Sequence, residues 1–196
     1  MSTAYYDANA ETFFADSVAT EAAHLHARFL PHVARGGRIL DAGCGSGRDA
    51  RAFLEAGYAV EAFDGSVEMA RRASIHTGLP VRHMRFDEVE WTGEFDGIWA
   101  CASLLHVARA DLPATMARLV RALKPGGVMF ASFKEGDRER EQGGRRFTDL
   151  TEAALSSLLT GLGMEVIGLL SNADGRPGRE GERWVSAVGR KRSVSP

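Results

Sequence analysis

The chain has 196 residues, of which 44% are hydrophobic and 26% charged, and its formal net charge is −2 at pH 7. This length suits one well-buried core, and the near-neutral charge gives no general attraction to nucleic acid or anionic membranes. The N-terminus lacks the pattern of a secretion signal, and no apolar run approaches the ~20 residues that span a bilayer. We therefore expect a cytoplasmic protein without a membrane or nucleic-acid partner, with its oligomeric state left open. Cys44 and Cys101 are expected to be buried thiols, and no metal site is predicted.

Short apolar runs alternate with amphipathic stretches along most of the chain. The apolar runs predict strands at residues 38–42, 58–63, 81–84, 95–101, 128–133, 164–170 and 184–190. Apolar residues at helical spacing predict helices at residues 17–33, 49–56, 66–76, 111–123 and 151–162. Two stretches poor in apolar residues, 134–146 and 172–183, are predicted to be long polar loops at the ligand-binding end.

The order of these elements predicts the class of fold. Repeated strand–helix–strand units form parallel sheets with right-handed crossovers and helices on both faces. The last two strands have no helix between them, so we expect them to pair antiparallel at one edge. The predicted fold is an α/β, Rossmann-like, doubly wound sheet of seven strands, mostly parallel with an antiparallel last strand.

A glycine-rich turn, Asp41-Ala42-Gly43-Cys44-Gly45-Ser46-Gly47, follows the first predicted strand. Ligands of doubly wound sheets bind at the carboxyl ends of the strands, where glycines let a ligand approach the backbone. The Gly-x-Gly-x-Gly spacing differs from the Gly-x-Gly-x-x-Gly of pyrophosphate-binding turns. A carboxylate at Asp41 would repel pyrophosphate but suits a cationic cofactor. A turn that needs glycines for structural reasons alone is the alternative.

The chain has three landmarks in this order: the glycine turn, the segment 95–106 and the stretch Lys124-Pro125-Gly126-Gly127. The same order is found in the class I S-adenosylmethionine-dependent methyltransferases, which the chain therefore resembles. The resemblance covers residues 37–190, nearly the whole length. It implies a methyltransferase domain at residues 37–196, preceded by an N-terminal helical lid segment at residues 1–36. It also implies that the cofactor is S-adenosyl-L-methionine.

The resemblance further implies which residues contact the cofactor. The turn would hold its methionine part, Asp64 the ribose hydroxyls, and Phe86 with Asp87 the adenine, while the end of the fourth strand would pass beside the sulfonium. The complete set implied by the resemblance is Asp41, Gly43, Cys44, Gly45, Gly47, Asp64, Gly65, Ser66, Met69, Phe86, Asp87 and Ala102. For Asp64, a place beside a helix N-cap is the alternative.

The acceptor side of the reaction depends on residues outside this signature. His106 follows the fourth strand, where an acceptor would enter, and has a near-neutral ordinary pKa, so it is the candidate general base. Tyr5 and Tyr6 are candidate substrate contacts from a lid. Packing roles are the alternatives for His106 and for these tyrosines. Arginine side chains suit anionic groups, and the candidates here are Arg145, Arg146, Arg176 and Arg179, whose alternative is pairing with neighbouring glutamates.

Three functions remain open at this point. The leading one is methyl transfer to a small-molecule acceptor, and the arginines listed above favour an anionic acceptor. More narrowly, residues 45–49, 99–107 and 176–179 with Trp184 are similar to the tellurite-resistance-like methyltransferases. The second is a nucleic-acid or protein methyltransferase, which the neutral charge and the lack of a recognition domain disfavour. The third is a non-catalytic sensor or partner protein that binds S-adenosylmethionine, because binding and catalysis are separable.

Overall fold

The computed structural model describes residues 2–174, 179 and 181–193. Its seven-stranded sheet has the order β3-β2-β1-β4-β5-β9-β8. The strands are β1 (Arg38–Ala42), β2 (Ala59–Asp64), β3 (Arg82–His83), β4 (Phe95–Ala100), β5 (Leu123–Lys134), β8 (Met164–Ala173) and β9 (Arg183–Lys191). The first five strands pair in parallel, whereas β9 is antiparallel to both β5 and β8. The predicted fold class is therefore confirmed.

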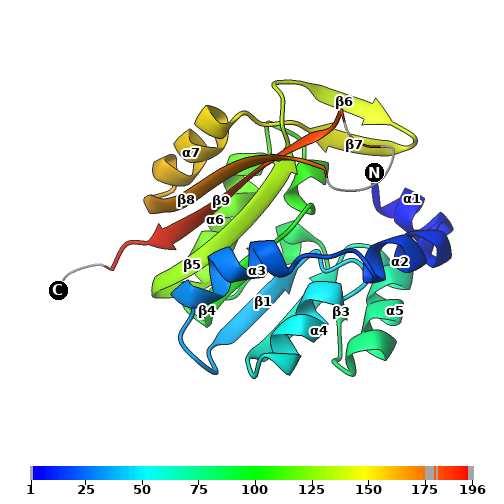
Figure 1. Cartoon of the computed structure of the whole chain (residues 1–196), viewed down its shortest axis with the longest axis horizontal. Helices are drawn as coiled ribbons and strands as arrows, with labels where there is room; N and C mark the ends of the chain where they lie inside the picture. The colour runs from blue at the N-terminus through cyan, green and yellow to red at the C-terminus, as the bar shows by residue number, and fades with distance from the viewer. Residues whose placement is uncertain (1, 175–178, 180, 194–196) are drawn as a thin grey trace.

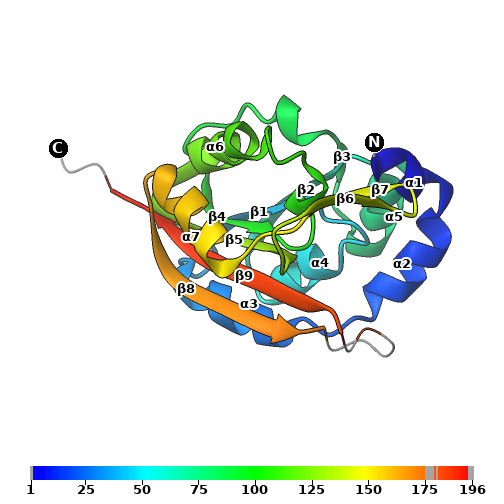
Figure 2. The same cartoon turned by 90° about the horizontal axis from the view of Figure 1, so that it is seen from above.

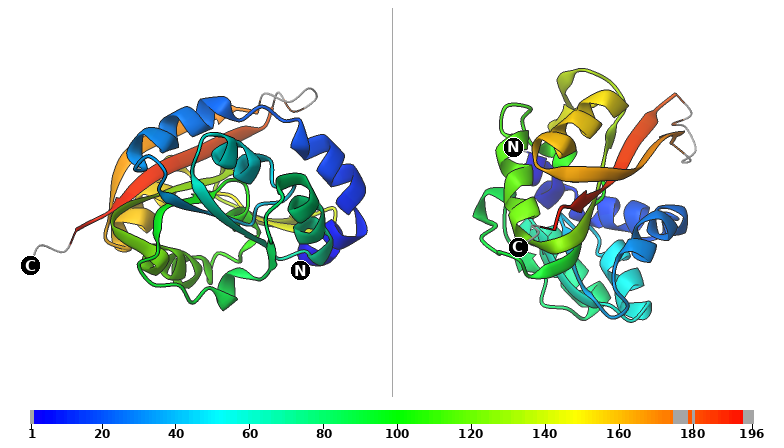
Figure 3. Two further views of the ribbon diagram at one scale, coloured as in Figure 1. Left: turned by 90° about the horizontal axis from the view of Figure 1, so that it is seen from below. Right: turned by 90° about the vertical axis from the view of Figure 1, so that its left-hand side faces the viewer.

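Helices cover both faces of the sheet. They are α3 (Ala23–Phe29), α4 (Arg48–Glu55) and α5 (Val67–Thr77) on one face, and α6 (Leu112–Ala122) and α7 (Glu152–Gly161) on the other. The blue α3 and the green α6 lie on opposite sides of the sheet in Figure 3. Because side chains alternate along a strand, neighbouring residues enter different cores. Ile39 of β1 packs in the core beneath α3 and α4, and Leu40 packs in the core beneath α6 and α7.

The N-terminal residues differ from the prediction of one helix over residues 17–33. Instead, α1 (Ser2–Ala8) and α2 (Ala10–Val18) precede α3, and a 3-10 turn (Leu30–His32) follows it. The hydroxyls of Ser17 and Thr20 donate to main-chain carbonyls four residues earlier, at 2.7 and 3.0 Å, and such bonds compete with helix continuation. Figures 1 and 2 show α1 and α2 beside the end of the sheet where β1 and β2 terminate.

The predicted loop at residues 134–146 is also wrong. It contains most of a hairpin made of β6 (Glu139–Gln142) and β7 (Arg145–Thr148), which forms a separate two-stranded sheet. Gly143 and Gly144 connect the two strands with φ of 56° and 74°, the left-handed values that a tight hairpin turn requires. In Figure 2 this hairpin crosses above the sheet toward α1. Part of the other predicted loop belongs to β8, which continues to Ala173.

Short 3-10 helices complete the ligand end of the sheet. These are η2 (Phe86–Glu88), after β3, and η3 (Leu104–His106), after β4. Among the described helices, none combines the length and apolar character that crossing a bilayer requires. The division into a lid segment 1–36 and a domain 37–196 stays a prediction.

Candidate cofactor and acceptor site

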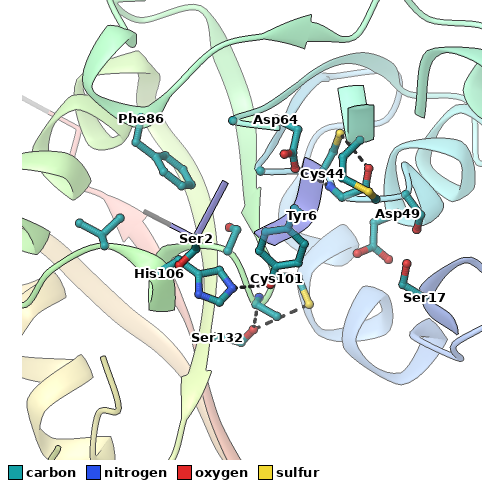
Figure 4. Close-up of a pocket in the computed structure, with 18 of the residues that line it drawn as sticks. Ser2, Tyr6, Ser17, Cys44, Asp49, Asp64, Phe86, Cys101, His106 and Ser132 are labelled. Atoms are coloured by element: carbon teal, nitrogen blue, oxygen red, sulfur yellow. Dashed lines mark hydrogen bonds between the residues drawn. The ribbon is translucent and has the colours of Figure 1, made fainter. Parts of the chain in front are cut away.

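A cavity of about 1220 Å³ lies at the carboxyl ends of β1, β2 and β4. Its wall combines the glycine turn with residues of α1, α2, η2, η3 and the β6–β7 hairpin. Figure 4 shows Cys44 of the turn with Tyr6, Phe86 and His106 around this cavity. Ligands of open α/β sheets bind at this edge, and here the sheet order reverses between β1 and β4. The predicted cofactor residues Gly43, Cys44, Gly45, Asp64, Gly65, Met69, Phe86, Asp87 and Ala102 all line this cavity.

The glycines of the turn have two different roles. Gly43 and Gly45 line the cavity with φ of 76° and 56°. A Cβ at Gly43 would lie only 2.6 Å from the Cβ of Ser103, so the end of β4 requires glycine at that position. Gly47 has φ of 76°, and it is not part of the cavity wall. A Cβ there would lie 2.8 Å from Cγ2 of Thr77, so Gly47 permits close packing of α4 against α5.

Asp64, the last residue of β2, links the turn to the next helix. Its Oδ2 accepts a hydrogen bond from the amide of Gly45 at 2.8 Å, and its Oδ1 accepts one from the amide of Ser66 at 2.8 Å. Burial raises the pKa of the Asp64 carboxyl, and the two amide donors act against that shift. Each carboxylate oxygen can still accept another hydrogen bond, because an ionised carboxyl has about four acceptor positions.

Asp41 lies behind the turn and outside the cavity wall. Its Oδ2 accepts a hydrogen bond from the amide of Ala50 at 3.1 Å, near the start of α4. Burial raises the pKa of Asp41 well above its usual range, and the charge of Asp49 raises it further. The structure therefore gives Asp41 a helix-capping contact, whereas the sequence suggested direct contact with the cofactor.

Asp49 is a buried carboxylate of the cavity wall that no sequence motif marks as a site residue. It accepts hydrogen bonds from Nε2 of His26 at 2.8 Å, the Arg48 guanidinium at 2.7 Å and Nε1 of Trp99 at 2.9 Å. Burial by itself raises the pKa of Asp49, but the donors on His26 and Arg48 outweigh burial and lower it to about 2. Asp49 is thus ionised beside the glycine turn, where the Arg48 guanidinium, which also lines the cavity, balances its charge.

The residues predicted around the adenine, Phe86 and Asp87, belong to η2 and line the cavity. Phe86 contacts the turn, because a Cβ at Gly43 would be 3.3 Å from its ring. Asp87 is exposed, and its carboxylate accepts two hydrogen bonds from the Arg85 guanidinium, each at 3.0 Å. Met69 is buried in the first turn of α5. These positions agree with a role at the cofactor, and that role stays a prediction.

The end of β4 has a strained backbone. Ala102 has φ of 52°, a left-handed value that is uncommon outside glycine. Its amide donates to Oγ of Ser132 on β5 at 2.8 Å, and the Ser103 hydroxyl donates to the carbonyl of Ala42 at 2.7 Å. Burial raises the pKa of the neighbouring Cys101 thiol to about 12, so this thiol is an inert part of the wall. The residue that holds the strained turn, Ser132, was not identified from the sequence.

The helix α1 closes one side of the cavity through contacts at both of its ends. Asp7 accepts a hydrogen bond from the Ser66 hydroxyl at 2.6 Å and a longer one from the amide of Glu68 at 3.3 Å. At the other end, Oγ of Ser2 accepts from the amide of Arg146 at 3.0 Å. The helix therefore bridges the cofactor side, at α5, and the β6–β7 hairpin.

Tyr6 on α1 meets His106 on η3 inside the cavity (Figure 4). The Tyr6 hydroxyl lies 2.7 Å from Nε2 of His106, and the carbonyl of Arg146 lies 2.6 Å from Nδ1. Burial lowers the pKa of His106 to about 4, although the bond to this carbonyl acts the other way. Burial also raises the pKa of Tyr6, against the opposing charge of Arg145. Tyr5 lies outside the cavity wall, with its ring 4.5 Å from the Arg145 guanidinium.

The predicted arginines are not gathered around one ligand position. Arg146 lines the cavity but forms an ion pair with Glu139 at 2.8 Å. Arg145 packs over aromatic rings and is not part of the cavity wall. Arg179 lies 3.7 Å from the carboxylate of Glu182, also away from that wall. Arg176 lies outside the described residues. Throughout the described part of the chain, no group of three or more His, Cys, Asp or Glu side chains could hold a metal ion.

Known proteins resemble this chain in sequence and in fold. Residues 14–166 match a family described as "Methyltransferase domain". A ubiquinone biosynthesis O-methyltransferase of Methylocella silvestris is 37% identical over 54% of this chain and 43% of its own length. An S-adenosyl-L-methionine-dependent Diels-Alderase of Talaromyces variabilis is 34% identical over 66% of this chain and 46% of its own length. The chain thus spans less than half of these curated relatives.

A solved structure covers more of the chain. The Burkholderia thailandensis 1,6-didemethyltoxoflavin-N1-methyltransferase, with its bound substrate and S-adenosylhomocysteine, aligns with a TM-score of 0.77 and 26% identity. The alignment covers 97% of this chain and 85% of that one. Together with the family match, it confirms S-adenosylmethionine as the cofactor. The chain belongs to the methyltransferase-domain family of S-adenosylmethionine-dependent enzymes.

Proposed function

We propose that this chain transfers the methyl group of S-adenosylmethionine to a small-molecule acceptor. The observation that carries the proposal is that the cofactor turn and the Tyr6–His106 pair line the same cavity of about 1220 Å³. A single ligand usually occupies a pocket of roughly 300–1,000 Å³. The larger volume suits a cofactor and an acceptor bound together, which in-line methyl transfer requires.

In this proposal the cofactor lies along the turn. Asp64 accepts hydrogen bonds from the ribose hydroxyls with the acceptor positions that Gly45 and Ser66 leave open. Phe86 and Asp87 frame the adenine.

The acceptor lies toward α1, η3 and the hairpin, with His106 as the group that takes up its proton. Two similar proteins are named for small-molecule substrates, a demethylated toxoflavin and ubiquinone precursors, which supports this class of acceptor. An anionic acceptor has less support, because Arg146 already pairs with Glu139 and carboxylates outnumber arginines in the cavity wall. The similarity to tellurite-resistance-like enzymes does not define the acceptor and stays a prediction.

The test is a panel of candidate metabolites incubated with the protein and S-adenosylmethionine, with S-adenosylhomocysteine formation as the readout. We expect turnover on at least one small molecule. Cofactor binding without turnover on any acceptor would favour a non-catalytic sensor, and methylation of added RNA, DNA or protein would favour the macromolecular alternative.

A substitution connects this activity to the site. Asp64→Ala should weaken cofactor binding by about 100-fold, because hydrogen bonds to a charged acceptor contribute roughly 1.5–3 kcal/mol each. Calorimetric titration with S-adenosylhomocysteine measures the effect. The matched control is Asp137→Ala, which removes an exposed carboxylate distant from the turn in sequence. Unchanged affinity in Asp64→Ala would refute the role of Asp64 in binding the ribose.

A further inference from the structure

Both ring nitrogens of His106 have partners in this structure. The carbonyl of Arg146 can only accept a hydrogen bond, so Nδ1, at 2.6 Å, must carry a proton. Since burial keeps His106 neutral at pH 7, Nε2 has no proton and accepts one from the Tyr6 hydroxyl at 2.7 Å. An acceptor therefore cannot reach either nitrogen of His106 directly while α1 is in place.

Tyr6 stands between His106 and the cofactor turn. Its ring packs edge-on against Phe13, with ring centroids 4.8 Å apart, and Phe13 lies 3.8 Å from the position of a Cβ at Gly45. Tyr6, Phe13, Gly45 and His106 all line the cavity. The Tyr6 oxygen is thus the polar atom that joins the cofactor side of the cavity to His106.

The direction of the Tyr6 hydrogen bond determines what the oxygen can offer to an acceptor. A tyrosine hydroxyl has one proton and two lone pairs, and this proton is committed to Nε2 of His106. Only lone pairs remain, and the Arg145 guanidinium hydrogen-bonds to one of them, so the other lone pair accepts a hydrogen bond from a protonated group. We infer that Tyr6 is the catalytic residue that receives the acceptor's proton and passes its own to His106, and that the acceptor is a neutral O–H or N–H compound. This inference rests on the proposed function.

The step balances in atoms and charge. The acceptor oxygen or nitrogen attacks the methyl carbon, and the carbon–sulfur bond breaks with its electron pair remaining on sulfur. The acceptor's proton moves to the Tyr6 oxygen while the Tyr6 proton moves to Nε2 of His106. The products are the methylated acceptor, S-adenosylhomocysteine, an intact tyrosine and a His106 imidazolium, which carries the positive charge that the sulfonium brought.

The surroundings suit a short-lived transfer of this kind. An oxygen or nitrogen that is forming a bond to carbon becomes strongly acidic, so even a weak base accepts its proton in the transition state. The Arg145 guanidinium favours negative charge on the Tyr6 oxygen, and the same charge lowers the pKa of His106, so the imidazolium releases its proton again once the methyl group has moved. The position of Arg145 over the ring of Phe147, 5.2 Å from the centroid, holds it beside the pair.

The test compares Tyr6→Phe with Tyr58→Phe, using S-adenosylmethionine and an acceptor identified by the metabolite panel. Tyr6→Phe keeps the ring against Phe13 and removes only the hydroxyl. We expect kcat to fall about 100-fold or more, the usual contribution of a proton-transfer group, with unchanged affinity for S-adenosylhomocysteine. Tyr58→Phe also loses a hydroxyl, which donates to the carbonyl of Leu30 at 3.5 Å outside the cavity, and should keep the wild-type kcat.

Two further measurements separate a proton relay from a packing role. The double variant Tyr6→Phe/His106→Gln should lose no more activity than the more damaging single variant, because the two residues act as one unit. Nitrogen NMR of labelled histidine should show that His106 is protonated at Nδ1 at pH 7, and the chemical shift of Nε2 should change in Tyr6→Phe.

Three outcomes would each overturn the inference: a wild-type kcat in Tyr6→Phe, additive losses in the double variant, or a proton on Nε2 of His106. Absence of turnover in the wild type is a different result, which contradicts the proposed function itself.

Discussion

The two halves of the cavity are built in different ways. The cofactor half is made of the glycine turn, the start of α4 and the end of β2, and the contacts of Asp41 and Asp64 within it span 2 to 19 positions. Trp99 and Ser103, at and after the end of β4, reach it over 50 and 61 positions. The acceptor half joins α1, η3 and β7 through contacts over 100 positions, between Tyr6 and His106, and 144 positions, between Ser2 and Arg146. Contacts within the β1–α4–β2 segment therefore shape most of the first half, and packing of more distant segments shapes the second.

This difference predicts that a single backbone change damages the cofactor half most. Gly43→Ala should lower the free energy of unfolding by about 3 kcal/mol, because it adds a left-handed strain of roughly 1–2 kcal/mol to a steric clash with Ser103. Gly78→Ala is the control, since Gly78 has a similar φ of 75° with open space around its Cβ position, and should lose only the strain. Urea denaturation measures both. Equal losses would show that Ser103 imposes no constraint on the turn.

Mild acid should act on the acceptor half instead. The pKa of His106 is about 4 in the folded protein and ordinarily about 6.5, so below pH 6.5 the unfolded chain binds a proton that the folded chain does not. The free energy of unfolding therefore has its full value above pH 6.5 and decreases as the pH falls toward 4. Between pH 7 and pH 5 the decrease due to His106 is about 2 kcal/mol. Asp49, with a pKa of about 2, keeps its charge over this range.

Denaturation of the wild type and of His106→Gln at pH 7 and pH 5 measures this loss. The variant should lack the pH dependence that His106 causes. Asp41 and Asp64, whose pKa values are raised, are present in both proteins, so their effects cancel when the stability of the variant is subtracted from that of the wild type. Arg145, Arg146 and Tyr6, the neighbouring charged or titratable groups, are likewise unchanged. An identical pH dependence in the two proteins would contradict a buried neutral His106.

The smallest effect is expected where the two halves are joined. Asp7→Ala removes the acceptor of the Ser66 hydroxyl at the α5 end of α1, at a cost of about 1 kcal/mol. Amide hydrogen exchange of residues 2–8 should accelerate while β1 and β2 keep their protection. Asp16→Ala, which removes an exposed carboxylate on α2, is the control and should leave exchange in α1 unchanged. Accelerated exchange throughout β1 and β2 would mean that the halves do not open independently.

The hairpin shows how a local signal can be present and still be overlooked. Gly143-Gly144 is a dipeptide typical of two-residue hairpin turns, and its flanking strands are four residues each. Their charged side chains conceal the alternation that identifies a half-buried strand, so the sequence pattern of residues 134–146 predicts a loop. For α1 the reason is different, because a helix of seven residues is marginal alone and is stabilised by its tertiary contacts.

The sequence by itself determined the sheet class, the seven strands of the main sheet and the glycine turn, because apolar periodicity and glycine spacing act over a few residues. It also indicated His106 as a base. It did not separate α1 and α2 from α3, and it did not reveal the β6–β7 hairpin. Only the tertiary structure decided that Asp41 lies behind the turn, that Asp49 pairs with Arg48 in the cavity wall, and that the Tyr6 hydroxyl meets His106 inside the cavity. Those positions depend on which distant segments pack together, and the free energy of that packing is shared among many contacts that no short motif encodes.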